Sequence, residues 1–349
     1  MLKALQWLQY AEEKIDWAQV YRDFAEFLDQ LPSEFGPRFH FDAYHLHGVK
    51  EQWDGGAATL PNMLIPVPRQ EWCYEHFQIP VTRNGSVHLV GVPGRSDSIR
   101  RPFLLDYPFL LHEAGHAHLE HFGAPFKERF EEVLQTVLNR QARRRMPLRG
   151  QAKSRSESRS DEIKQHWSIQ HQGMWAFELA IDVIALWTCG PAYLDTLTHY
   201  LREHYDDKFQ IEPSHPPAAL RGEMLLQAAR RLKWSDYAGE LKSRVDDWMQ
   251  QGPPSFNRYQ SLTDDQIVGG CLDAAFDYCE EMNLPRLTQN GLARIESQIE
   301  ENRELVGTDL IVGAWIVEQR RDEDAYDKWE RNVFRDFVED LRAELETSS

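Results

Sequence analysis

Residues 108–121 read PFLLHEAGHAHLEH, and they decide how the rest of the chain is interpreted. Pro108 suits the first position of a helix, because the amide proton that it lacks has no partner in the first turn. Gly123 and Pro125 follow the stretch, and both residue types are typical of the end of a helix. The sequence therefore predicts a helix that begins at Pro108 and ends near His121.

This predicted helix contains an H-E-x-x-H sequence formed by His112, Glu113 and His116. Two histidines four residues apart lie on one face of a helix, so both imidazoles can bind a single metal ion. Glu113 follows the first histidine and can reach a metal-bound water as a general base. Apolar residues 109–111 precede the motif, and a buried helix has little reason to carry three such polar side chains.

A catalytic zinc site needs a third protein ligand. The metzincin pattern would require Gly and His where this chain has Leu119 and Phe122, so that class is rejected. His118 and His121 do not share the face of the motif histidines well. We interpret both as surface histidines or as residues that support the ligands from outside.

Glu178 is the better candidate for the third ligand. It lies four residues before Asp182 in an otherwise apolar stretch, so both carboxylates lie on one face of a predicted helix. Because an unpaired buried carboxylate is costly, each needs a partner. Glu178 as a ligand and Asp182 as the hydrogen-bond acceptor for a zinc-bound imidazole would satisfy both. The alternative is a half-exposed helix with two solvated acids.

The fold class expected from the sequence is α+β, mostly α-helical. Phe77, Ile79 and Val81 alternate with polar residues, and Asn84-Gly85 is a strong signal for the turn of a β-hairpin. We expect a zincin-like core with a small β-hairpin or sheet beside the motif helix. The predicted organisation is an N-terminal helical region at 1–58, a metallopeptidase core at 59–225 and a C-terminal helical region at 226–349.

Residues 146–162 are rich in Ser and Arg, and we expect a mobile loop there that could cover the cleft. Between Arg140 and Ser160 the chain has eight basic residues and one acid, a local charge of about +7. This stretch is either a solvated segment or a docking site for an acidic partner.

The motifs together resemble a known family. H-E-x-x-H followed by E-x-x-x-D is the gluzincin arrangement, and the segment 214–221 (SHPPAALR) is similar to the His-Pro-Pro…Arg element of the CAAX prenyl proteases and their bacterial heat-shock relatives. The resemblance covers three short motifs in residues 112–221. It implies that His112, His116 and Glu178 bind zinc, that His215 stabilises the oxyanion, and that Arg221 locks the Glu178 region by a charged hydrogen bond.

The composition limits which partners and which cellular location we expect for this protein. The chain has 39 basic and 56 acidic residues, a net charge of −17, which disfavours nucleic acid and anionic lipid as main partners. We expect no membrane span, unlike in the family that the motifs resemble, and no signal peptide. The four cysteines show no C-x-x-C spacing, and a reduced, cytoplasmic location fits them best.

The function expected from the sequence is that of a zinc-dependent endopeptidase acting on a protein or peptide, although Mn, Fe or Co can bind the same ligands. Two alternatives stay open. One is a non-catalytic, zinc-stabilised interaction module, and the other is a defence or toxin-type protease with one cellular target. The presence of Glu113 favours an enzyme over the non-catalytic module, because a purely structural site has no use for a base.

Overall fold

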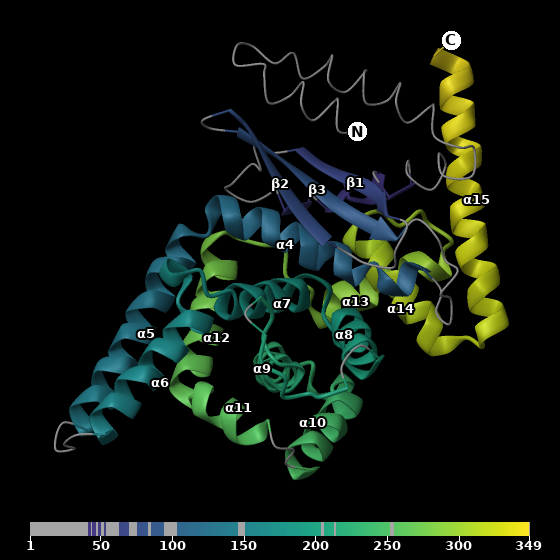
Figure 1. Cartoon of the computed structure of the whole chain (residues 1–349). Coiled ribbons are helices and arrows are strands. Elements are labelled where there is room, and N and C mark those ends of the chain that lie inside the picture. Colours follow the sequence, from purple (N-terminus) through teal and green to yellow (C-terminus); the bar gives the residue numbers. More distant parts are fainter. Residues whose placement is uncertain are drawn as a thin grey trace. The chain divides into compact units, whose positions relative to one another are not determined.

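The computed structural model describes most of the chain (Figure 1). The described residues are 41–42, 44–46, 48–49, 52–53, 63–69, 75–82, 85–93, 103–145, 151–203, 206–212, 214–251 and 255–348. The helix predicted within residues 1–40 lies outside them. Among the described helices, none combines the length and the apolar composition needed to cross a lipid bilayer.

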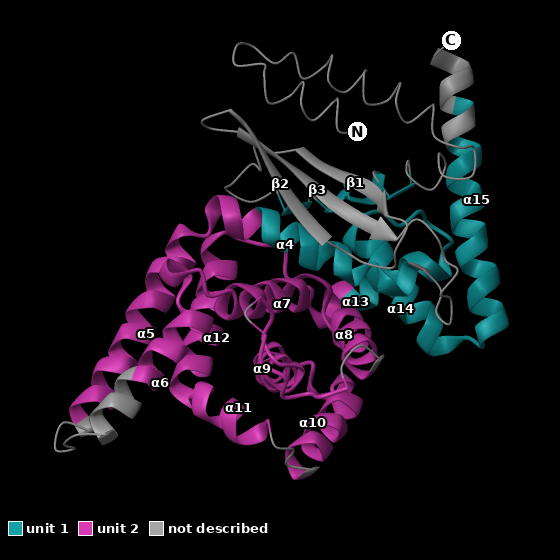
Figure 2. Ribbon diagram, in the orientation of Figure 1, with its two compact units in different colours: residues 1–117, 292–349 teal, residues 118–291 magenta. Residues whose placement is uncertain are grey.

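The chain divides into two compact units, coloured in Figure 2. Unit 1 consists of Met1–Ala117 and Leu292–Ser349, and unit 2 consists of His118–Gly291. The C-terminal segment thus belongs to the same unit as the N-terminal part of the chain. This division follows tertiary contacts, and the boundaries expected near residues 58 and 225 stay a prediction.

Unit 1 contains three strands in a small sheet. They are β1 (Met63–Arg69), β2 (Glu75–Thr82) and β3 (Gly85–Pro93), in the order β1-β3-β2. β2 and β3 are antiparallel, with Phe77 opposite Leu89, whereas β1 runs parallel to β3. Pro66 and Pro80 lie in the two outer strands, where a residue without an amide proton is tolerated.

The prediction of an α+β fold is wrong. Helices make up most of the described residues, and the three strands contribute only 24. The strands contact one another, and no helix in the described part of the chain makes more than slight contact with them. The expected zincin-like core, with the sheet packed beside the motif helix, is therefore not shown by the contacts of the described residues. Alternation of apolar residues indicated strands locally, but the described core is built from helices that pack on helices.

The helical part of unit 1 includes the start of the motif helix. Its elements are η1 (Phe103–Asp106), the first part of α4 (Pro108–Phe122), most of α13 (Gln289–Glu300), α14 (Thr308–Arg320) and α15 (Glu323–Ser348). The described residues of 41–53 are also helical. Phe41 packs edge-on against Phe334 and Phe337 of α15, at ring-centroid distances of 5.4 and 5.2 Å. Segments from both ends of the chain thus share one apolar core.

All regular elements among the described residues of unit 2 are helices. Its elements are α5 (Ala124–Arg145), α6 (Gln151–Trp167), η2 (Ile169–His171), α7 (Trp175–Cys189), α8 (Pro191–Glu203), α9 (Ala218–Leu232), η3 (Ser235–Tyr237), α10 (Gly239–Gln251), α11 (Phe256–Leu262) and α12 (Asp265–Glu281). Every residue of α7 is buried, as expected for a helix that is apolar on all sides. α7 contacts α6, α8, α9 and α12, so it forms the centre of this unit.

The expected mobile loop at 146–162 is also wrong where the structure describes it, because α6 begins at Gln151. Neighbouring helices hold this Ser-rich helix in place. Ile163 and Trp167 are fully buried, and the indole N–H of Trp167 donates to the carbonyl of Leu262 at 2.9 Å. Tertiary packing therefore outweighs the weak intrinsic helix preference of serine.

Candidate metal centre

The start of α4 is fixed within unit 1. The amide of Leu110 donates to the carbonyl of Tyr107 at 2.8 Å, which forms the first turn around Pro108. The hydroxyl of Tyr107 donates a buried hydrogen bond to the carboxylate of Asp42. The predicted helix is confirmed, with its first residue at Pro108 and its last at Phe122.

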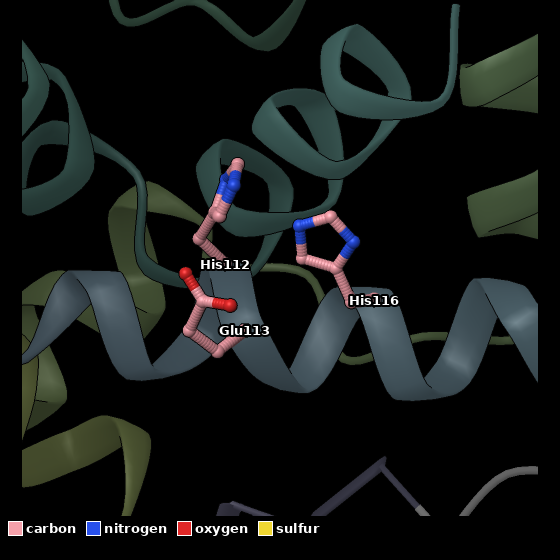
Figure 3. Close-up of side chains that lie close together, drawn as sticks. All are labelled: His112, Glu113 and His116. Atoms are coloured by element: carbon pink, nitrogen blue, oxygen red, sulfur yellow. The ribbon is translucent and has the colours of Figure 1, made fainter. Parts of the chain in front are cut away.

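His112, Glu113 and His116 form one compact group on this helix (Figure 3). One ligand atom from each side chain lies within 4.8 Å of the others. The two imidazole rings stand on the same side of α4, with centroids 5.1 Å apart and planes at 80°. His112 and Glu113 are buried and His116 is half-buried. The prediction that two histidines four residues apart lie on one face of the helix is therefore confirmed.

This group can hold a metal ion. Two imidazole nitrogens and a carboxylate oxygen are donors that zinc accepts, and iron, cobalt and manganese accept them as well. Burial strengthens the attraction between a cation and a carboxylate, because little water competes for either. The residues present thus fit a divalent metal without specifying which one.

The two other histidines of α4 lie on the part of the helix that belongs to unit 2. His118 is buried, and its Nδ1 shares a hydrogen bond of 2.7 Å with the hydroxyl of Tyr278 on α12. His118 is therefore not a surface residue, and the other interpretation, that it supports the metal ligands from outside, stays a prediction. His121 is exposed, in agreement with the sequence analysis.

The two acids of α7 are buried, Glu178 at 3% and Asp182 at 1% relative exposure. This excludes the alternative of a half-exposed helix with solvated carboxylates. Glu178 lies in the first turn of α7, where its amide donates to the carbonyl of Met174 at 2.9 Å. The positive end of the helix dipole favours a carboxylate at such a position.

Arg221 of α9 forms a bidentate ion pair with Asp182. Its Nε donates to Oδ2 at 2.8 Å and its Nη2 donates to Oδ1 at 2.7 Å. The guanidinium is itself buried, so water does not weaken the pair. The resemblance implied a charged hydrogen bond from Arg221 into the Glu178 region, and the observed acceptor is the acid one turn further along α7.

Tyr193 of α8 is a further member of this cluster, which sequence reasoning missed. Its hydroxyl donates to Oδ1 of Asp182, and the residue is fully buried. Burial raises the pKa of Tyr193 well above its usual value, and the negative charge of Asp182 raises it further, so the hydroxyl stays a proton donor. Arg221 and Tyr193 thus donate three hydrogen bonds to the Asp182 carboxylate, and a bond from a ligand imidazole to this carboxylate stays a prediction.

His215 lies in the turn before α9 and is exposed. Its Nδ1 forms a hydrogen bond of 3.0 Å with the hydroxyl of Ser214. The two prolines that follow are buried, and Pro217 is the residue from which α9 starts. The segment thus joins an exposed histidine to the helix that carries the buried Arg221.

The predicted site residues therefore appear as two buried clusters and one exposed histidine. His112, Glu113 and His116 form the cluster of unit 1, and this metal-ligand group does not include Glu178. In unit 2, Asp182 lies on α7 with Glu178 and is joined to Arg221 of α9, and residues 215–217 lie just before α9. No sequence signal identified Tyr193, because only the packing of α8 on α7 places it at Asp182.

Searches against family models, curated proteins and solved structures found no match to this chain.

Proposed function

We propose that this chain is a zinc-dependent endopeptidase of the gluzincin type. In this proposal His112 and His116 hold the metal with Glu178 as the third ligand, and Glu113 is the general base. The observation that carries it is the compact, largely buried His112–Glu113–His116 group on one helix. Glu178 is included as a ligand because it belongs to the E-x-x-x-D motif and because it is buried on α7.

A bound zinc ion supplies Lewis acidity, which polarises a carbonyl and makes a water molecule more acidic. Glu113 accepts one proton from the water whose oxygen bonds to the carbonyl carbon of the peptide. It then passes this proton to the amide nitrogen as the carbon–nitrogen bond breaks. The products are a carboxylic acid, which releases its proton to water, and a free amine, and Glu113 returns to its ionised form.

His215 and Arg221 have supporting roles in this proposal. Because Nδ1 of His215 is engaged by Ser214, we assign the other nitrogen, Nε2, to the oxyanion of the substrate. Arg221 fixes Asp182, and with it the helix that carries Glu178. Neither residue has to change its charge during the reaction.

The direct test compares metal content and hydrolysis in four purified proteins, the wild type, Glu113→Gln, Glu178→Ala and Glu128→Gln. Fluorescently labelled unfolded casein serves as a general protein substrate. We expect one zinc ion per wild-type chain, and its loss in Glu178→Ala. Glu113→Gln should keep its zinc while hydrolysis falls by roughly 10²–10⁴-fold. Glu128 is exposed on α5, so Glu128→Gln controls for the loss of one negative charge.

Two results contradict the proposal. A wild-type protein that binds no metal would remove the centre itself. A Glu113→Gln protein that keeps both its metal and its biological effect would favour the non-catalytic interaction module, since the base would then be dispensable.

A further inference from the structure

The cluster around Asp182 ties three helices together at one buried point. Asp182 lies on α7, Tyr193 on α8 and Arg221 on α9. Both oxygens of the carboxylate accept hydrogen bonds, Oδ2 from Arg221 and Oδ1 from Arg221 and Tyr193. The three residues are between 0% and 3% exposed. A carboxylate held by three donors in a dry environment has a single favourable orientation.

We propose that Tyr193 is a positioning residue of the metal centre, which acts through Asp182 on the proposed ligand Glu178. This inference rests on the proposed function, because it concerns the affinity of the same centre for its metal. Tyr193 does not touch the metal in this account. Its hydroxyl holds Asp182, and Asp182 holds the helix on which Glu178 lies.

The mechanical link is the geometry of α7. Glu178 and Asp182 are four residues apart, so they lie on one face of the helix, about 6 Å apart along its axis. With Asp182 anchored to α8 and α9, α7 cannot rotate or slide without breaking buried hydrogen bonds. The Glu178 side chain therefore starts from a fixed backbone, and less conformational freedom is lost when it binds a cation.

The turn between α7 and α8 places Tyr193 for this role. Gly190 ends α7 with a φ of 54°, a conformation that favours glycine. The amide of Tyr193 donates to the carbonyl of Gly190 at 3.1 Å, so α8 begins directly after the turn. A side chain at position 190 would also come within 2.8 Å of Leu287, which leaves little room for another geometry.

The test is the zinc affinity of the full-length Tyr193→Phe protein, measured by competition with a chelator of known affinity. The substitution removes one hydroxyl and keeps the ring. We expect zinc to dissociate roughly tenfold more readily than from the wild type. Thermal unfolding of the metal-free proteins, measured in parallel, reports the purely structural cost.

The matched control is Tyr259→Phe. Tyr259 is also buried in unit 2, and its hydroxyl donates to the carboxylate of Glu223 at 2.7 Å. Both substitutions thus delete a buried hydroxyl that donates to an acid, and both should lower metal-free stability. Only Tyr193→Phe should lower the zinc affinity.

Equal zinc affinity in the wild type, Tyr193→Phe and Tyr259→Phe would overturn the inference, since Tyr193 would then act on stability alone. If Tyr193→Phe does not fold, Asp182→Asn decides, because it keeps Tyr193 and removes the charge through which it acts. An unchanged affinity in that variant overturns the inference too. Failure of the proposed function looks different, since the wild type would then bind no zinc or Glu178→Ala would keep it.

Discussion

The backbone amide of Leu104 donates a hydrogen bond of 2.8 Å to the carboxylate of Glu330, a residue 226 positions later in the chain. Leu104 lies in η1, directly before the motif helix α4, and Glu330 lies on α15. Both residues are buried. The hydroxyl of Tyr326 lies 3.4 Å from the same carboxylate oxygen. The C-terminal helix thus supports the segment that leads into the H-E-x-x-H motif.

Replacing this carboxylate should destabilise unit 1. Glu330→Ala leaves the amide of Leu104 buried without this acceptor, and we expect a loss of about 1–3 kcal/mol in the free energy of unfolding. Glu330→Gln keeps an acceptor oxygen and should cost less. Denaturant unfolding of the metal-free protein measures both. Glu339→Ala removes an exposed acid of α15 and should change stability by less than about 0.5 kcal/mol. Equal effects of Glu330→Ala and Glu339→Ala would show that the bond contributes nothing.

The ion pair between Asp182 and Arg221 should show strong coupling. Arg221→Met leaves a buried carboxylate without its cation, and we expect a cost of about 3–5 kcal/mol. Asp182→Leu should cost a similar amount, and the double variant should cost less than the sum of the two. A double-mutant cycle by denaturant unfolding tests this. The surface pair Arg244–Glu240 is the comparison, with a coupling well under about 1 kcal/mol. Additive losses at positions 182 and 221 would contradict the expectation.

Two adjacent glycines of α12 should respond to alanine with opposite signs. A Cβ at Gly270 would lie 2.3 Å from Cγ1 of Val133 on α5, whereas a Cβ at Gly269 meets nothing within 4 Å. Gly269→Ala should therefore stabilise the helix by about 0.5–1 kcal/mol. Gly270→Ala forces α5 and α12 apart or shifts a stiff β-branched side chain, which should cost about 1–3 kcal/mol. The melting temperatures of the two variants, compared with that of the wild type, test this prediction. A shift of the same sign in both variants would show that the packing at Val133 yields easily.

His45 should make the stability of unit 1 depend on pH. Burial lowers the pKa of this imidazole from 6.5 to about 3. The unfolded chain therefore binds a proton between these values while the folded chain does not. The contribution of His45 to the free energy of unfolding is fully present above pH 6.5 and is lost progressively as the pH falls towards 3. Between pH 7 and pH 5 we expect a loss of about 2 kcal/mol.

His45→Gln tests this dependence, because glutamine cannot take up the proton. Unfolding free energies measured at pH 7 and pH 5 should differ less in the variant than in the wild type. Glutamine can still offer an oxygen to the amide of Gly307, which lies 3.4 Å from Nδ1 of His45. The same pH dependence in both proteins would mean that His45 is protonated in the folded state.

Local sequence signals predicted the motif helix well. Proline at its start and glycine after its end are signals that act within a few residues, so the bounds of α4 follow from the chain itself. The facing imidazoles of His112 and His116 follow from helical periodicity alone. The burial of Glu178 and Asp182 followed from the apolar residues around them.

Other predictions failed because they depend on distant segments. The Ser-rich stretch that forms α6 lacks a strong local helix signal, and buried contacts of Ile163 and Trp167 decide its conformation. Strands β2 and β3 lie where the alternating residues of the sequence indicated strands, yet the class of the fold depends on which elements pack on one another. That packing involves helices almost alone among the described residues.

The sequence by itself determined which side chains form the candidate centre, since residue type and helical spacing place two imidazoles and a carboxylate together. The tertiary structure alone decided which residues contact Asp182 and the segment before α4. Tyr193 and Arg221 meet Asp182 from two other helices, and Glu330 reaches Leu104 from the far end of the chain. Such contacts depend on the docking of whole helices, and no local pattern of residues encodes it.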